Sequence, residues 1–266
     1  MSNNDQTSST FSASPEEIAL RVELEMNKSL HESTFSLREK VALACRMLAD
    51  EGHARTLAGQ VSARAEQSGT FWTTNFGAGF ADARTSNLVR IDRDLNVVEG
   101  EGMANPGVRF HLWIYESRPD LNSIVHTHPP YTSALSIIGE ELAVAHMDAT
   151  PFHGDCAFLS EWPGIPLANE EGRIICEALG EKRSILLANH GLLTTGKTLE
   201  EAVYLAILFE QAAQMQITAS SVAAIRPVRP ELAKESHDFM VKHKVIVATF
   251  SYWARQTLRK YNDVLQ

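Results

Sequence analysis

The sequence predicts an α/β fold in which a central β-sheet is flanked by helices. Three observations predict it: a capped helical segment early on, a group of short strand-like segments after it, and two apolar strands that alternate with helices further on. Strands interspersed with helices favour a layered α/β domain. No internal repeat, low-complexity core segment or linker interrupts residues 15–266, so we expect one domain with a C-terminal helical extension. Residues 1–14 are rich in Ser, Thr and Asn and are predicted to be a disordered tail.

The first half of the chain is predicted to contain a helix, three strands and a second helix. Ser36 and Glu39 form a capping box, after which apolar residues recur at helical spacing until Gly52. The segments that follow are short, partly alternating and rich in β-branched and aromatic residues, which is typical of strands. These strands are expected over 59–64, 70–74 and 87–92, with the second helix over 107–117.

The second half is predicted to alternate buried strands with helices. Residues 123–128 are apolar and stop at two prolines, and residues 184–190 are apolar and stop at a glycine. Each is therefore predicted to be a buried strand. Thr198 is expected to cap a long helix, with Glu201 completing its capping box. The other helices are expected over 131–138, over 169–179 and, after Pro227 and Pro230, in a last stretch that ends near Tyr261.

Composition and charge exclude several classes of function. The net charge of −9 argues against a nucleic-acid partner, because phosphate binding needs clustered Lys and Arg. No stretch reaches the roughly 20 apolar residues of a membrane span, and the N-terminus lacks the apolar core of a signal peptide. The 3 cysteines form no CxxC pair, which suits buried thiols in a reducing compartment. We therefore expect a cytoplasmic protein that acts on a small molecule.

Three histidines lie at the ends of the two predicted buried strands. His126 and His128 are two residues apart, so their side chains leave the strand on the same face, and His190 follows the second apolar segment. Three imidazoles leave coordination positions open for water or substrate, which is the arrangement of a catalytic rather than a structural metal site. A histidine in an apolar segment is often only a satisfied structural group. From spacing alone, the metal site and the structural role remain open alternatives.

Several motifs resemble those of the class II aldolase and adducin family. Residues 59–64 (GQVSAR) resemble that family's G-N-x-S-x-R strand. Residues 109–130 resemble the block that ends in H-T-H, and residues 188–202 resemble the N-H-G block with the G-x-T-x-E-E-A that follows it. The resemblance extends from about Ser36 to about Ser220, and the blocks occur in the family's order.

The resemblance has direct implications for fold, cofactor and assembly. It implies a mainly antiparallel central sheet flanked by helices. It also implies one divalent metal ion per subunit, held by His126, His128 and His190, and a homotetramer with its sites between subunits. Neutral imidazole ligands suit Zn, Mn and Fe alike, so the sequence does not choose the metal.

Departures from the family's pattern bear on the chemistry. Gly107 stands where the sugar-phosphate aldolases carry the Glu that transfers a proton, and glycine has no group to move a proton. Phe76 and Gln60 replace a hydroxyl and an Asn in the phosphate-binding segments. The resemblance therefore argues against a phosphorylated sugar and favours a flat substrate against an aromatic wall. Packing of Phe76 in the core is the alternative interpretation.

Each role in such a site has a candidate in the sequence. Arg109, together with Arg64, is a candidate to pair with a carboxylate of the substrate. The candidate proton donors are His153, His111 and a tyrosine, such as Tyr131 or Tyr261, supplied by a neighbouring subunit. The residues expected to bind substrate are Gln60, Arg64, Thr74, Phe76, Gly77, Gly107 and His111.

Four functions compete on these observations. The leading hypothesis is a metal-dependent carbon–carbon lyase that decarboxylates a hydroxylated aromatic or pyridine carboxylate, with the metal as Lewis acid. The second is a non-haem iron oxygenase that performs an oxidative decarboxylation on the same fold. The third is an aldolase that acts on a non-phosphorylated substrate. The fourth is a non-catalytic, adducin-like assembly module, which the persistence of three metal-ligand histidines disfavours.

Overall fold

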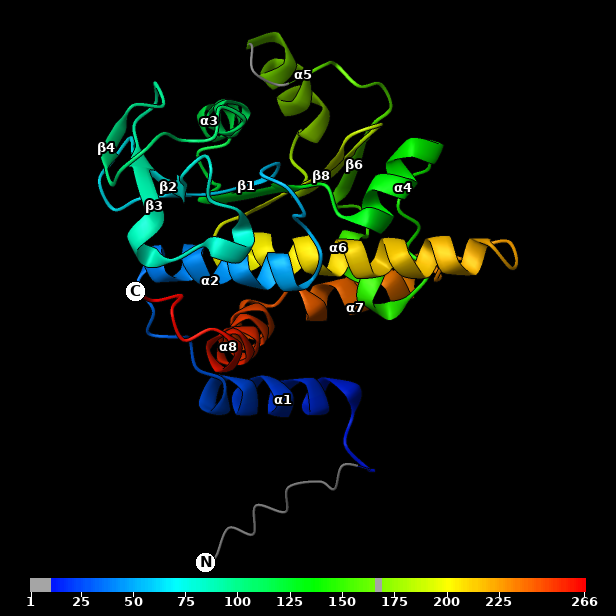
Figure 1. The fold of residues 1–266 in the computed structure, drawn as a ribbon. Coiled ribbons are helices and arrows are strands. Elements are labelled where there is room, and N and C mark those ends of the chain that lie inside the picture. Colours follow the sequence, from blue (N-terminus) through cyan, green and yellow to red (C-terminus); the bar gives the residue numbers. More distant parts are fainter. Residues whose placement is uncertain (1–10, 166–168) are drawn as a thin grey trace, which may run out of the picture.

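A single eight-stranded sheet forms the centre of the protein (Figure 1). The computed structural model describes residues 11–165 and 169–266. The strand order is β4-β3-β2-β1-β5-β8-β7-β6, and all neighbours are antiparallel except β6 and β7. The predicted α/β class with a mainly antiparallel central sheet is confirmed. The strands are β1 (Gln60–Arg64), β2 (Phe71–Thr74), β3 (Leu88–Ile91), β4 (Val97–Glu99), β5 (Ser123–Thr127), β6 (Cys156–Leu159), β7 (Ser184–Leu187) and β8 (Gly191–Gly196).

Helices cover both faces of this sheet. Figure 1 shows α3 and α5 on one side and α2 and α6 on the other, with α8 and then α1 beyond them. Side chains alternate along each strand, so every central strand contributes to both cores. In β5, Ile124 packs on the α3 side and Val125 on the α6 side. The helices are α1 (Pro15–Ser29), α2 (Leu37–Asp50), α3 (Val108–Ser117), α4 (Pro130–Ile138), α5 (Asn169–Leu179), α6 (Leu199–Ser220), α7 (Pro230–Met240) and α8 (His243–Lys260).

The structure adds elements that the sequence patterns did not predict. The strand predicted over 184–190 ends at Leu187, and β8 then runs back beside it. The chain reverses at Asn189, whose φ of 54° lies in the left-handed region that Asn tolerates better than most residues. Strands β4 and β6 were also missed, because runs of three or four residues carry little periodicity.

Three features of the helices differ from the prediction. The Ser14 side chain caps α1, a helix that was not predicted and that has no buried residue; the rest of the predicted tail, residues 1–10, lies outside the described residues. Thr198 caps α6 as expected, but Glu201 does not complete the box: its carboxylate accepts from the backbone N–H of Lys197 instead. The last helical stretch is two helices, α7 and α8, that meet near Val241. Among the described residues, no helix is long and apolar enough to cross a membrane.

Candidate metal centre

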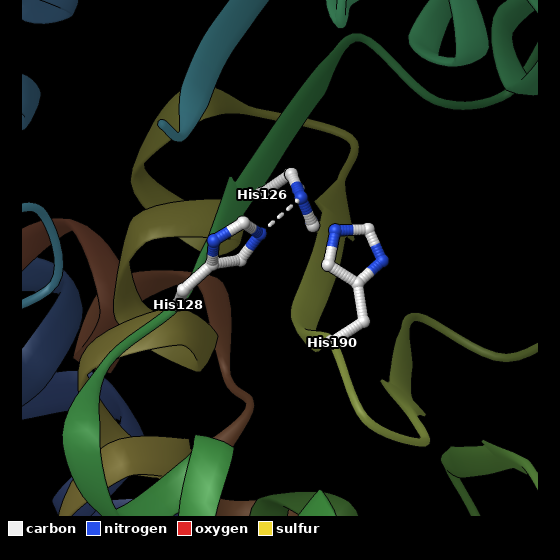
Figure 2. A group of neighbouring side chains, drawn as sticks. All are labelled: His126, His128 and His190. Carbon is white, nitrogen blue, oxygen red and sulfur yellow. Dashed lines mark hydrogen bonds between the residues drawn. The ribbon is translucent and has the colours of Figure 1, made fainter. Parts of the chain in front are cut away.

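The fold brings the three histidines together at one end of three adjacent strands. His126 is the fourth residue of β5, His128 follows the end of that strand, and His190 lies in the turn between β7 and β8. Because β5 pairs with β8 and β8 with β7, the three side chains meet although they come from distant parts of the sequence. Their potential ligand atoms all lie within 4.8 Å of one another. Figure 2 shows the three rings converging on one point.

The geometry of the group suits a divalent ion. The Nε2 atoms of His126 and His128 are 3.0 Å apart, and the ring centroids of the three pairs are separated by 4.7–4.8 Å. Three nitrogens at the Zn–N distance of about 2.0–2.1 Å in a tetrahedral arrangement are roughly 3.3 Å apart. The His126 Nδ1–H donates to the backbone oxygen of Leu192 at 2.9 Å, which leaves the Nε2 lone pair free to bind metal.

Burial keeps these histidines neutral. Desolvation holds the pKa of His126 well below its usual value, and the neighbouring His190 and His128 add to this effect. Burial and the proximity of His128 lower the pKa of His190 to about 4, and burial also lowers the pKa of His128. A metal ion binds the neutral imidazole, so at neutral pH the three ligands need not lose a proton first.

The chain around His128 is held by close packing and by hydrogen bonds. A Cβ on Gly191 would lie 2.5 Å from the backbone oxygen of Thr127 and 2.7 Å from Cδ2 of His128. Only a glycine therefore lets β8 approach β5 so closely. A few residues after His128, the backbone N–H groups of Tyr131 and Thr132 donate to the carboxylate of Glu210 on α6. These are the first free N–H groups of α4, and no side chain of the N-cap residue satisfies them.

The three histidines line a cavity of about 520 Å³. Of the residues predicted to bind substrate, Gln60, Phe76 and Gly107 line it. Phe76 is 43% exposed, so the interpretation that it packs in the core is wrong. The complete lining consists of Thr56, Leu57, Ala58, Gln60, Phe76, Asn105, Pro106, Gly107, Phe110, His126, His128, Ile165 and His190.

Comparison with known proteins identifies the family of this chain. Residues 39–217 match the family model described as class II aldolase and adducin N-terminal domain. The chain belongs to the class II aldolase and adducin family. The matched range includes β1, β5 and the turn with His190, each of which contributes residues to the cavity lining.

Proteins with several different activities in their names are similar to this chain. It is 31% identical over 208 residues to 4-hydroxy-3-prenylphenylpyruvate oxygenase/4-hydroxy-3-prenylbenzoate synthase of Streptomyces roseochromogenus subsp. oscitans, covering 77% of this chain and 74% of that protein. It is also 31% identical over 208 residues to decarboxylase NovR of Streptomyces niveus, covering 77% and 76%. The solved L-fuculose 1-phosphate aldolase from Glaciozyma antarctica PI12 has a TM-score of 0.81 and 27% identity, covering 89% of this chain and 97% of that chain.

Thr74 and Gly77 lie beside the cavity rather than in it. With Phe76 and Asn105 they line a second, smaller hollow. Phe76 and Asn105 line both spaces, so the loop after β2 forms the wall between them.

Arg64 and Arg109 do not face the histidines. Both line a separate cavity of about 220 Å³, on the face of α3 that carries Trp113. The Arg64 guanidinium lies 4.7 Å from the ring centroid of Tyr115 and donates to the backbone oxygens of Leu121 and Tyr115. In this structure neither arginine is placed to pair with a carboxylate bound at the histidines.

His111, Tyr131 and His153 are also absent from the cavity lining. His111 is fully buried beneath it, where its Nδ1 is 2.8 Å from the Ser62 hydroxyl. Tyr131 lies in the first turn of α4 and packs against the core of the α6 face. His153 follows the short helix η3 (Met147–Phe152). A role for these residues in catalysis stays a prediction.

The sequence patterns missed one wall of the cavity. Thr56, Leu57 and Ala58 form it from the loop between α2 and β1, and Ile165 closes another side. The only signal for them is that the loop directly precedes the G-Q-V-S-A-R strand. The patterns also did not predict Asn105 as a residue of the cavity. Its side chain donates to the backbone oxygen of Leu57 at 3.1 Å and so ties the loop to the site.

Buried histidines also make the stability of the fold depend on pH. Burial lowers the pKa of His53 and of His111 to about 3, from a usual value of 6.5. Between these values the unfolded chain binds more protons than the folded one, so the free energy of unfolding falls as the pH drops below about 6.5. Replacing His53 with Asn, which can keep a hydrogen bond to Thr127, is expected to reduce this slope by up to about 1.4 kcal/mol per pH unit.

Urea unfolding of metal-free protein, followed by tryptophan fluorescence at several pH values between about 7 and 4, measures this slope. The matched control is His31→Asn, at an exposed histidine between α1 and α2, which should leave the slope as it is in the native protein. An equally steep slope in the native protein and in His53→Asn would contradict the prediction.

Proposed function

We propose that this protein is a metal-dependent carbon–carbon lyase, and that it decarboxylates a hydroxylated aromatic or pyridine carboxylate. The observation that carries the proposal is the composition of the cavity. Three histidines are its metal ligands, and the described lining contains no Asp, Glu, Lys, Arg, Tyr or Cys. A cavity without an acidic or basic side chain suits a reaction that begins with the loss of CO2 and not with the removal of a proton.

The chain's own residues bind and enclose such a substrate. A divalent ion on His126, His128 and His190 would supply a Lewis acid for a carboxylate and a neighbouring oxygen. The three histidines are neutral and the other described walls carry no charged side chain, so the positive charge of a bound ion would favour an anionic ligand there over a cationic one. Phe76 and Phe110 provide apolar, aromatic walls that suit a flat ring.

The carbon that loses CO2 needs a proton afterwards. Within the described cavity only Thr56 and the histidines carry a proton on a hydroxyl or imidazole, and the histidines are the metal ligands. We therefore propose that water or a residue of a neighbouring subunit donates the proton. A homotetramer with its sites between subunits would supply such a residue.

A second candidate function is oxidative decarboxylation with iron and oxygen. The observation that favours it is the similarity to the Streptomyces roseochromogenus protein, which is named as an oxygenase and a benzoate synthase. Three neutral histidines and open positions suit Fe(II) as well as Zn or Mn. The two candidates share the substrate class and differ in whether oxygen is consumed.

One experiment separates the two candidates. Protein loaded in turn with zinc, manganese or Fe(II) is mixed with a panel of hydroxylated aryl and pyridine carboxylates and with aryl pyruvates, and both CO2 release and O2 uptake are measured. We expect CO2 release that persists without oxygen. Release that requires oxygen and occurs only with iron would replace the lyase by the oxygenase. No CO2 from any compound, with a fully loaded site, would overturn both.

A further inference from the structure

Gln60 occupies a position inside the metal cavity that calls for an explanation. It lies directly opposite His126 in the register of β1 and β5, so both side chains leave the sheet on the same face. Only 6% of Gln60 is exposed. Its Oε1 is buried and has no hydrogen-bond partner within the described part of the chain. A buried amide oxygen without a partner reduces stability, and such groups are rare unless they serve a ligand.

Gly107 provides the space that this amide fills. A Cβ at residue 107 would lie 2.7 Å from Nε2 and 3.0 Å from Cδ of Gln60, closer than non-bonded atoms normally approach. The backbone of Gly107 has φ −61° and ψ −19°, a conformation open to every residue type. Its conformation therefore does not require glycine at this position, whereas the neighbouring amide does.

Asn105 bounds the same space from the other side. Its Oδ1 accepts from the backbone N–H of Gly107 at 2.9 Å, and its Nδ2 donates to the backbone oxygen of Leu57. Both ends of this side chain are thus held by main-chain groups. Oδ1 of Asn105 lies 3.2 Å from the position of the missing Cβ, so the Gln60 amide and the Asn105 amide together fill the volume beside Gly107.

We infer that Gly107 keeps room for the Gln60 carboxamide, and that this amide is the neutral hydrogen-bonding group that orients a small carboxylate substrate beside the three histidines. The substrate class rests on the proposed function. The unpartnered Oε1 can accept from a hydroxyl group of the substrate, and the Nε2–H group can donate to a carboxylate or carbonyl oxygen. Neither hydrogen bond requires the amide to gain or lose a proton, so Gln60 positions the ligand and takes no part in proton transfer. A substitution at Gln60 removes this carboxamide, and a larger residue at position 107 displaces it, so both changes should weaken binding of the ligand for the same reason.

Thermal unfolding of the metal-loaded protein tests the spatial part of the inference. Gly107→Ala is expected to lower Tm by roughly 2–6 °C, because its Cβ collides with the amide. In a Gln60→Ala background the same change is expected to have little effect, because the colliding atoms are gone and alanine is favoured over glycine in a helical conformation. An equal loss of Tm in both backgrounds would overturn the spatial part.

Ligand binding tests the recognition part. The probe is phenylglyoxylate, an aryl α-keto acid, titrated calorimetrically into protein whose metal content has been measured. Gln60→Leu and Gly107→Ala are each expected to weaken binding roughly tenfold, the equivalent of one hydrogen bond. The double variant Gln60→Leu, Gly107→Ala should bind no more weakly than Gln60→Leu alone. The matched control is Gln256→Leu, an exposed glutamine on α8, which should bind as the native protein does.

Different results would overturn the recognition part and the spatial part of the inference. If Gln60→Leu binds phenylglyoxylate as tightly as the native protein while metal content is equal, the recognition part is overturned and the proposed lyase function is untouched. If the native, metal-loaded protein does not bind the probe, the recognition part is overturned, whereas the CO2-release assay decides the proposed function on its own panel of substrates. The Tm comparison decides the role of Gly107 in either case.

Discussion

Replacing His126 with alanine is expected to lower the affinity for Zn²⁺ by more than about 100-fold, since even the loss of a group that only orients a metal ligand costs about 10–100-fold. The His126 ring lies within 4.8 Å of both other rings, and its Nδ1 is held by the Leu192 backbone. With the ion gone, any lyase activity should disappear with it. Affinity is measured by competition with a chromogenic chelator, and the fold by circular dichroism.

The control for this substitution is His31→Ala, which removes an exposed histidine far from the cavity. It should bind zinc as the native protein does. A folded His126→Ala protein that retains a full complement of metal would contradict the assignment of the site. Native protein that binds no metal would direct attention to the adducin-like assembly role.

Gly191→Ala is expected to damage the site without removing any ligand. The added methyl group meets the Thr127 backbone oxygen at 2.5 Å and the His128 ring at 2.7 Å, so either β8 or the His128 ring has to move. We expect a loss of about 2–4 kcal/mol in the free energy of unfolding and a loss of about 10–100-fold in zinc affinity. Urea unfolding and chelator competition measure the two effects.

The control is Gly79→Ala. Its Cβ would have one neighbour within 4 Å, at 3.6 Å, and its φ of −69° suits alanine. This variant should match the native protein in both measurements. Stability and zinc affinity that are unchanged in Gly191→Ala would show that the space beside His128 is not as tight as the structure indicates.

The sequence predicts those parts of this protein that depend on local pattern. The capping box at Ser36, the helix over 169–179 and the shared face of His126 and His128 follow from residue spacing, and the structure contains each of them. The resemblance to family motifs implied that His190 and this pair hold one metal ion together. From spacing alone, His190 was only a third histidine at the end of a buried strand, and a structural role remained as open as a metal site.

What the sequence does not predict depends on contacts between distant segments. Arg64 and Arg109 look like partners for a substrate carboxylate until the structure places them on the other face of α3. The collision between a Cβ at residue 107 and Gln60 arises only when β1 and the start of α3 lie side by side. The wall formed by Thr56 to Ala58 belongs to a loop without a motif, and its position depends on a hydrogen bond from Asn105.

The carboxylate of Glu210 that caps α4 has a consequence for how the protein can be handled. It anchors the chain just after His128 to α6, and ladder hydrogen bonds join the strands that carry or precede the other two histidines. These ties are all made by the polypeptide, so the arrangement of the ligands does not depend on the ion. Unlike a zinc finger, which unfolds without its metal, this protein should survive dialysis against a chelator. One purified batch can then be emptied and refilled with zinc, manganese or iron, so that their reactivities are compared on identical protein.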